Sequence, residues 1–220
     1  MIPIKDSVPS YSFPIVMLTL IVTNVVVFFY EQSVPESLVR EFFFQYGLVA
    51  RRFFEDEGLN RKLISIFTSM FIHGGFWHLL GNMWFLWVFG DNVEDRFGHF
   101  RFLMLYLLSG IVAAILQVSF NPNDVTPMVG ASGSIAGVLG AYLILFPNAS
   151  ILTLVPIFIF VTFIHIPAFF FLALWFALQF IYGISSFTLT TSIAWWAHVG
   201  GFLSGIVLAF MLPKKTKRIA

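Results

Sequence analysis

Long apolar runs, separated by short polar segments, dominate the sequence. A membrane-spanning helix needs about 20 apolar residues, within a range of about 17 to 25. The sequence therefore predicts six transmembrane helices, at residues 14–30, 66–90, 102–120, 132–147, 167–185 and 196–212. A further apolar stretch, 151–166, contains Pro156 and ends before Pro167, which favours an interfacial or re-entrant connector. The predicted fold is an all-α, polytopic membrane protein built as a six-transmembrane-helix bundle.

The distribution of charge also indicates a membrane protein. Charged residues make up only 10% of the chain and hydrophobic residues 59%, whereas soluble domains carry about 25% charged residues. Between Phe102 and Pro213, Asp124 is the only Asp, Glu, Lys or Arg. No basic patch stands apart from the membrane flanks, so we do not expect nucleic acid as a partner. The sequence has no cysteine, which excludes disulfides and thiolate metal sites, and we expect neither a cofactor nor a metal.

Basic residues predict the orientation of the helices. Lys214, Lys215, Lys217 and Arg218 follow the last predicted helix, and loops rich in Lys and Arg face the cytoplasm. An even number of spans then gives a short cytoplasmic N-terminus (1–13), a membrane domain (14–212) and a basic cytoplasmic tail (213–220). The loop at 31–65 mixes basic with acidic residues, as amphipathic helices in the interface do. We predict a multi-pass protein of the plasma (inner) membrane, embedded in the lipid bilayer.

Among the polar side chains inside the predicted helices, where such residues are costly and mark functional sites by default, four stand out. His78 and Asn82 are separated by one helical turn and share one helix face. Ser132 and His198 lie near the beginning of the fourth and sixth helices, and each precedes the proline that ends its helix by the same number of residues. That separation is a rise of about 22 Å. Both residues should therefore lie at one depth, below the outer surface of a hydrocarbon core about 30 Å thick.

Small residues would allow the fourth and sixth helices to approach closely. They are Gly133, Ala136, Gly137, Gly140 and Ala141 in the fourth helix, and Gly201, Ser204 and Gly205 in the sixth. Close contact would bring the Ser132 hydroxyl to the His198 imidazole, the arrangement of a serine nucleophile and its general base. Neither helix carries a carboxylate to orient the imidazole, so we predict a Ser–His dyad. The Asn82 amide, the His78 ring and the Ser132 backbone N–H are the candidate oxyanion donors.

These residues belong to motifs that resemble those of the rhomboid family of intramembrane serine proteases. The resemblance covers residues 65–212 and follows the family's order of motifs. The motifs are H-x-x-x-N at 78–82, E-x-R-x-G at 94–98, G-x-S-G at 130–133 and H-x-x-G-x-x-x-G at 198–205. Where many members have Trp-Arg before the second span, this chain has Ile64-Ser65, a departure that bears on the anchoring of the first external loop.

The resemblance implies a simple six-span form that cleaves transmembrane protein substrates. It implies that Ser132 attacks a peptide bond, that His198 moves the proton, and that His78 and Asn82 support the oxyanion. Hydrolysis inside a membrane also needs water, so we expect the hydroxyl-rich segment 185–192 to cap a polar cavity. The bulky segment 169–180 is the expected gate for substrate.

Each polar group also has a purely structural interpretation. Ser132 would then be a small packing residue, His78 with Asn82 an interhelical hydrogen-bonded pair, and His198 an interfacial side chain; a structural role is favoured for His73.

One rival function is a catalytically inactive rhomboid-like protein that binds membrane clients. Another is a small transporter, although its usual repeats and intramembrane carboxylates are missing from the sequence. No H-E-x-x-H motif is present, which excludes that class of metalloprotease. The physiological substrate and the oligomeric state stay open.

Overall fold

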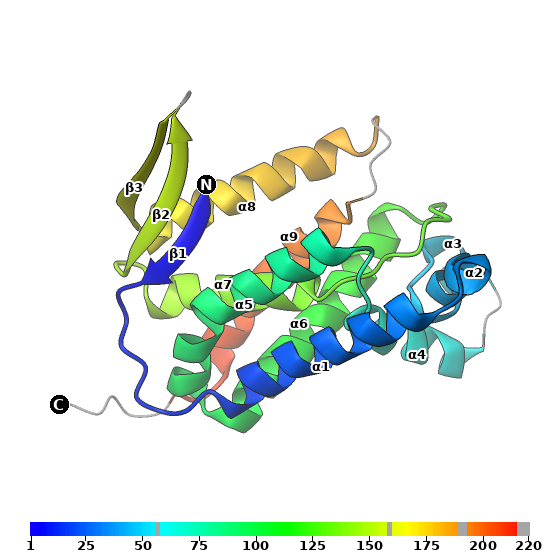
Figure 1. Cartoon of the computed structure of the whole chain (residues 1–220), viewed down its shortest axis with the longest axis horizontal. Coiled ribbons are helices and arrows are strands. Elements are labelled where there is room, and N and C mark those ends of the chain that lie inside the picture. Colours follow the sequence, from blue (N-terminus) through cyan, green and yellow to red (C-terminus); the bar gives the residue numbers. More distant parts are fainter. Residues whose placement is uncertain (56–57, 158–159, 189–192, 215–220) are drawn as a thin grey trace.

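The structure, a computed structural model, describes residues 1–55, 58–157, 160–188 and 193–214. The described part is mostly helical, with a small antiparallel sheet at one end of the bundle (Figure 1). The helices are α1 (Ile15–Ser33), α2 (Glu36–Tyr46), α3 (Ala50–Phe54), α4 (Leu59–Ser69), α5 (Phe76–Phe97), α6 (His99–Phe120), α7 (Ser132–Leu145), α8 (Ala168–Ser185) and α9 (Trp195–Met211). The strands are β1 (Ile2–Asp6), β2 (Ser150–Ile157) and β3 (Phe160–Pro167).

The apolar runs of the sequence correspond to the long helices of the bundle. Among the described residues, α1, α6 and α8 are long and apolar enough to cross a membrane, and α7 and α9 are apolar but shorter. The run predicted as one helix at 66–90 is instead divided, because α4 ends at Ser69 and α5 begins at Phe76. The break contains His73-Gly74-Gly75, and paired glycines favour leaving a helix because they lose most conformational entropy inside one. The short helices α2, α3 and α4 gather at the end of the bundle opposite the sheet (Figure 1).

Helix α7 occupies the centre of the bundle, and its residues 133–142 are all buried. It packs most closely against α9, as the small residues of both helices predict. A side chain at Gly201 would collide with the carbonyl of Gly133, and one at Gly205 with the carbonyl of Gly137. Backbone therefore touches backbone along this contact, which only small residues permit.

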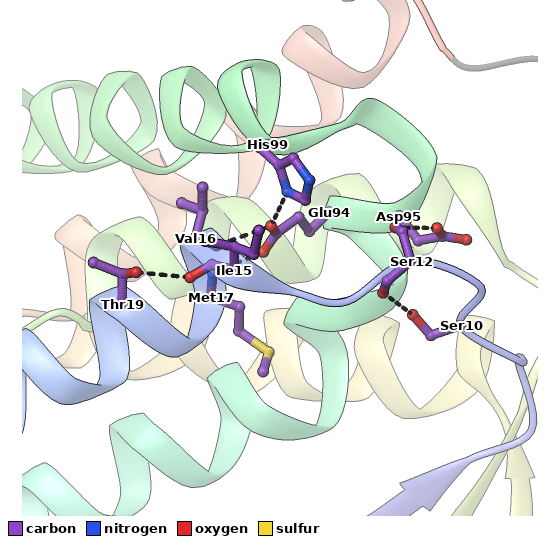
Figure 2. Close-up of polar contacts among 9 residues, drawn as sticks. All are labelled: Ser10, Ser12, Ile15, Val16, Met17, Thr19, Glu94, Asp95 and His99. Atoms are coloured by element: carbon purple, nitrogen blue, oxygen red, sulfur yellow. Dashed lines mark hydrogen bonds and ion pairs between the residues drawn. The ribbon is translucent and has the colours of Figure 1, made fainter.

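The carboxylate of Glu94 joins α5 to the beginning of α1 (Figure 2). Its two oxygens accept hydrogen bonds from the backbone N–H groups of Val16 (2.9 Å) and Met17 (2.7 Å), and one also meets His99 Nδ1 at 2.5 Å. The first N–H groups of a helix have no partner within the helix, and a negative charge there is favourable. Glu94 is fully buried, so this member of the E-x-R-x-G motif caps a helix. The glycine of the same motif, Gly98, has φ +81° in the turn from α5 to α6.

The three strands are the main departure from the predicted all-α fold. β1 pairs with β2, with Ile2 opposite Leu154, and β2 pairs with β3 as a hairpin, with Ile151 opposite Ile166. The residues of 151–166 are mostly β-branched or aromatic, which suits strands. Because these residues are almost all apolar, the sequence lacks the alternation of apolar and polar residues that identifies a strand. Pro156 instead indicates a break in the segment.

The segment 1–13, predicted as a short cytoplasmic N-terminus, includes β1, which lies along α5. The indole of Trp84 donates to the carbonyl of Pro3 (2.6 Å), and Asn92 Nδ2 donates to the Asp6 carboxylate (2.7 Å). The hydroxyl of Tyr142 also donates to Asp6. Burial raises the pKa of the Asp6 carboxyl, and the hydrogen bond from Tyr142 acts against that shift. The sheet thereby links α5, through β1, to the start of α8, which follows β3 directly (Figure 1).

Candidate active site

Ser132 is the first residue of α7, at the end of a turn that depends on Gly130. Gly130 has φ +119°, a conformation that residues with a side chain rarely adopt. Its N–H donates to the carbonyl of Ser69 (2.8 Å), which ties this turn to the end of α4. As the first residue of a helix, Ser132 has a backbone N–H without an intrahelical partner. This N–H lies at the positive end of the helix dipole.

His198 lies in the first turn of α9 and meets Ser132 across the α7–α9 contact. Its Nε2 is 2.8 Å from Ser132 Oγ, a hydrogen-bonding distance. The start of α9 is held by Gln117 of α6, whose Oε1 accepts a hydrogen bond from the N–H of Ala197 (3.1 Å). The rings of Trp175 and Trp195 flank the imidazole, each with its centroid 6.0 Å away. The close helix contact predicted from the sequence thus brings the hydroxyl and the imidazole together.

His78 and Asn82 lie beside this pair, on the first two turns of α5. A side chain at Gly130 would lie 2.7 Å from the His78 ring and 3.6 Å from Asn82 Nδ2. Asn82 is buried, and its Nδ2 also donates to the carbonyl of His78 (3.1 Å), whereas His78 is exposed toward the cavity described below. Two side-chain donors of α5 therefore approach the turn that leads into Ser132.

One cavity of about 920 Å³ contains all four of these side chains in its wall. α5, α7, α8 and α9 supply most of that wall, and Phe85 of α5 and Trp175 of α8 face it from opposite helices. At its other end the wall includes Arg40 and Phe44 of α2 and the loop 126–129. Within the described residues, no group of three or more His, Asp or Glu side chains could hold a metal ion.

His73 lies behind His78 and outside the wall of this cavity. Its ring packs edge-on against that of His78, with 5.2 Å between the centroids, and it is buried. Its backbone N–H donates to a carboxylate oxygen of Glu31 in α1 (3.0 Å). This position favours a supporting role for His73. The segment 185–192, predicted as a cap, lies partly outside the described residues, because 189–192 do not belong to them.

Gln179 of α8 is a site residue that the sequence prediction missed. Its Oε1 is 2.7 Å from His198 Nδ1, on the opposite side of the ring from Ser132. Gln179 is 8% exposed, and its Nε2 is 3.3 Å from the carbonyl of Trp175, one turn earlier. The predicted dyad follows from the absence of a carboxylate in the fourth and sixth helices, and Gln179 is an amide on the fifth. An amide inside an otherwise apolar helix was the available signal, because polar groups within the membrane are functional candidates.

Known proteins similar to this chain carry rhomboid names. Rhomboid protein 1, mitochondrial, from Saccharomyces cerevisiae is 41% identical over 96 residues, which cover 42% of this chain and 28% of the yeast protein. The putative rhomboid protease YdcA from Bacillus subtilis is 29% identical over 163 residues, which cover 70% of this chain and 69% of YdcA. The rhomboid protease GluP from the same bacterium is 42% identical over 78 residues, or 36% of this chain and 15% of GluP.

The chain spans less than half the length of the yeast relative and of two similar proteins from Arabidopsis thaliana. The match to the family itself is broader. Residues 60–215, which include α5 to α9 and all four predicted site residues, match the family model described as the rhomboid domain. Together with the apolar helices of the bundle, this match identifies an integral membrane protein, and the chain belongs to the rhomboid family.

Proposed function

We propose that this protein is an intramembrane serine endopeptidase that hydrolyses peptide bonds in or near transmembrane segments of other membrane proteins. The observation that carries the proposal is the 2.8 Å contact between Ser132 Oγ and His198 Nε2 in the wall of a cavity within an apolar helical bundle. A serine next to a base is the arrangement of an activated nucleophile. The protease names of the two Bacillus subtilis relatives support the same assignment.

In the proposed reaction, His198 Nε2 takes the proton of Ser132 as Oγ attacks the carbonyl carbon of the scissile bond. The tetrahedral intermediate collapses when the carbon–nitrogen bond breaks, and His198 returns the proton to the leaving amine. The acyl-enzyme is then hydrolysed: His198 takes a proton from water, the hydroxide adds to the ester, and Ser132 leaves with the proton restored. No metal or cofactor is required by this sequence of steps.

The oxyanion of the tetrahedral intermediate needs donors that are already in place. We assign this role to the Asn82 amide, the His78 ring and the backbone N–H of Ser132. A side chain at Gly130, two residues before Ser132, would lie 2.7 Å from the His78 ring and 3.6 Å from Asn82 Nδ2. The N-terminus of α7 adds the positive end of its dipole at the same point.

The proposed membrane arrangement has six spans: α1, α5, α6, α7, α8 and α9. α7 has 14 residues and is therefore about 21 Å long, less than the ~30 Å hydrocarbon core. With its end inside the core, Ser132 lies below the outer surface, and the cavity supplies the route for water. Both termini would lie in the cytoplasm, and the plasma (inner) membrane is the proposed location.

Substrate would enter the cavity from the side, between α5 and α8. These two helices meet near one end, where the rings of Phe89 and Phe171 are 6.2 Å apart, and the cavity lies between them toward the other. A helical substrate must unwind before Ser132 can reach its backbone, and Gly or Pro near the scissile bond lowers the cost of unwinding. We expect small residues beside the cut, because the turn at Gly130 is already crowded by His78.

The experiment uses the full chain in proteoliposomes with a fluorescently labelled transmembrane substrate. We expect cleavage by the native protein and none by Ser132→Ala or His198→Ala, because neither partner of the dyad has a substitute. Ser134→Ala is the matched control: this serine lies two residues further along α7 and is buried without a hydrogen-bond partner among the described residues, so cleavage should persist. Native-like cleavage by Ser132→Ala would contradict the proposal. Binding of the substrate without cleavage by the native protein would favour a client-binding rhomboid-like protein.

A further inference from the structure

We infer that Gln179 is a positioning residue that fixes the orientation and tautomer of the His198 imidazole, so that Ser132, His198 and Gln179 form one hydrogen-bonded array. The inference rests on the proposed function, because it assigns a role within that reaction. It extends the predicted dyad to a third helix, since Ser132, His198 and Gln179 come from α7, α9 and α8 respectively.

Hydrogen bonds at both nitrogens fix the orientation of the His198 ring. Both ring nitrogens of His198 are engaged at hydrogen-bonding distance, Nε2 with Ser132 Oγ at 2.8 Å and Nδ1 with Gln179 Oε1 at 2.7 Å. The two partners lie on opposite sides of the ring and therefore restrict its rotation about the side-chain bonds. Ring contacts with Trp175 and Trp195 restrict the remaining directions.

The surroundings of Gln179 fix the direction of its amide. With Oε1 toward His198, Gln179 Nε2 points to the carbonyl of Trp175, 3.3 Å away. Turning the amide over would place two carbonyl oxygens against each other and would leave a buried N–H₂ facing the ring. The carbonyl of Trp175 therefore favours the orientation in which Gln179 Oε1 faces the imidazole.

The amide oxygen of Gln179 also determines which nitrogen of the His198 ring carries the proton. A neutral imidazole carries one N–H and one lone pair, and a carbonyl oxygen can only accept. Gln179 Oε1 therefore selects the tautomer with the proton on Nδ1, which leaves the lone pair of Nε2 directed at the Ser132 hydroxyl. This is the tautomer that a general base needs. In the other tautomer Nε2 would already be protonated and could not accept the proton of Ser132.

The hydrogen bond between Gln179 and His198 becomes stronger in the transition state. When Nε2 takes the proton of Ser132, the ring becomes a cation and its Nδ1–H becomes a stronger donor. Hydrogen bonds to charged groups are stronger than those between neutral groups, so the bond to Gln179 strengthens as the charge develops. The amide does not itself take a proton. It differs from a carboxylate in adding no negative charge to a site that lies among apolar helices.

A structural role for Gln179 would be a simple interhelical hydrogen bond between α8 and α9. Such a bond would hold the helices together, and its loss would lower stability without a selective effect on the chemical step. Gln117 offers the comparison within the same chain, since its buried Oε1 also joins two helices by accepting from the N–H of Ala197 (3.1 Å). The two glutamines flank the start of α9, but only Gln179 contacts the imidazole.

The test compares Gln179→Met, Gln179→Glu and Gln117→Met with the native protein in proteoliposomes. Met fills a similar volume without an acceptor, and Glu keeps an oxygen at the same place. We expect kcat of Gln179→Met to fall about 10- to 100-fold with KM nearly unchanged, the loss expected for one hydrogen bond to a charged group. Gln179→Glu should recover most of this loss, and Gln117→Met should lower thermal stability without the selective loss of kcat. Equal kcat in the native and Gln179→Met proteins would overturn the inference.

A second measurement does not depend on activity. The ¹⁵N chemical shifts of the histidine rings distinguish a protonated from an unprotonated ring nitrogen, and the chain has only five histidines to assign. We expect native His198 to be protonated at Nδ1, and Gln179→Met to populate both tautomers. Protonation at Nε2 in the native protein would refute the assigned role. A native protein that cleaves nothing but shows the expected tautomer would refute the proposed protease function while leaving the positioning role intact.

Discussion

At the scale of single residues, Gly130 determines where Ser132 lies. Its φ of +119° sets the turn into α7, and the space that its missing side chain leaves is taken by the His78 ring. Backbone conformation and steric space thus both require glycine at this position. The turn places Ser132 at the beginning of the helix, so that a displacement of Gly130 would move the hydroxyl and the backbone N–H of Ser132 together.

We therefore expect Gly130→Ala to lower kcat about 100-fold, because a shift of roughly 1 Å at a reacting group can cost this much. The rate of substrate cleavage and the rate of labelling by a fluorophosphonate should fall in parallel. Gly58→Ala is the matched control, since a side chain there would meet nothing within 4 Å. Full activity of Gly130→Ala would show that the turn tolerates a side chain and that His78 does not need its present position.

The predicted site residues could be found from the sequence because each is a polar group within an apolar run. Ser132, His198, His78 and Asn82 satisfied this criterion, and the structure brings them to one cavity. Gln179 satisfies the same criterion, but the predicted dyad does not include it, because the usual third partner of such an imidazole is a carboxylate. Whether Gln179 faces α9 or lipid depends on how α8 is rotated about its own axis. That rotation is set by packing, and the hydropathy of this uniformly apolar helix does not reveal it.

At the scale of elements, the Glu94 carboxylate shows how one buried charge orders two helices. It lies on the last turns of α5 and satisfies two N–H groups at the start of α1. Its contact with His99 at 2.5 Å adds the beginning of α6. Three helix ends therefore meet at one side chain (Figure 2).

We expect Glu94→Gln to lower the free energy of unfolding by about 1–2 kcal/mol, the range for loss of a helix cap. The amide keeps one acceptor oxygen but loses the second oxygen and the negative charge, so one N–H of α1 remains unsatisfied. Thermal unfolding in detergent measures the effect. Glu36→Gln, which changes an exposed acidic residue in the first turn of α2, should cost only a few tenths of a kcal/mol. Equal stability of the two variants would mean that the cap contributes nothing.

Helices could be predicted more readily than strands in this chain, for a physical reason. A helix satisfies its backbone within one apolar segment, so that length and hydropathy reveal it. β1 instead depends on a partner far away in the sequence, and nothing in the polar residues near Met1 indicates Leu154 as that partner. The division between α4 and α5 was also missed, because the run at 66–90 contains no charged residue to mark it.

At the scale of the whole molecule, α8 forms one side of the proposed route into the cavity. It rests on α9 chiefly through aromatic contacts: the rings of Phe176 and Phe202 are stacked with 4.7 Å between their centroids, and Trp175 lies 5.9 Å from the same ring. Other large side chains of α8 are exposed, as expected for a lipid-facing helix. The contact with α9 is thus largely aromatic, and the loss of one ring contact should favour an opening of the route.

We expect Phe176→Ala to raise the rate of cleavage of a transmembrane substrate about 2- to 10-fold. Loss of an aromatic pair worth about 0.5–1.5 kcal/mol favours the open position of α8 by that factor. A fluorophosphonate small enough to reach Ser132 through the cavity should label the variant at the native rate. Phe170→Ala is the control, because Phe170 is 64% exposed on the same helix. An increase in both rates, or in neither, would argue against a route that passes α8.

The pairing of β1 with β2 has a consequence for the order of biosynthesis. A chain leaves the ribosome from its N-terminal side at about 5–20 residues per second, so β1 is made before α1, and its partner β2 only after α7. Until then the backbone of residues 2–6 has no hydrogen-bonding partner in the protein, and unpaired backbone is excluded from the lipid interior. The first strand must therefore wait in water while most of the helices are inserted. A strand translated before all of these helices can take its place beside α5 only after the hairpin emerges, and the sheet is among the last parts of the bundle to assemble.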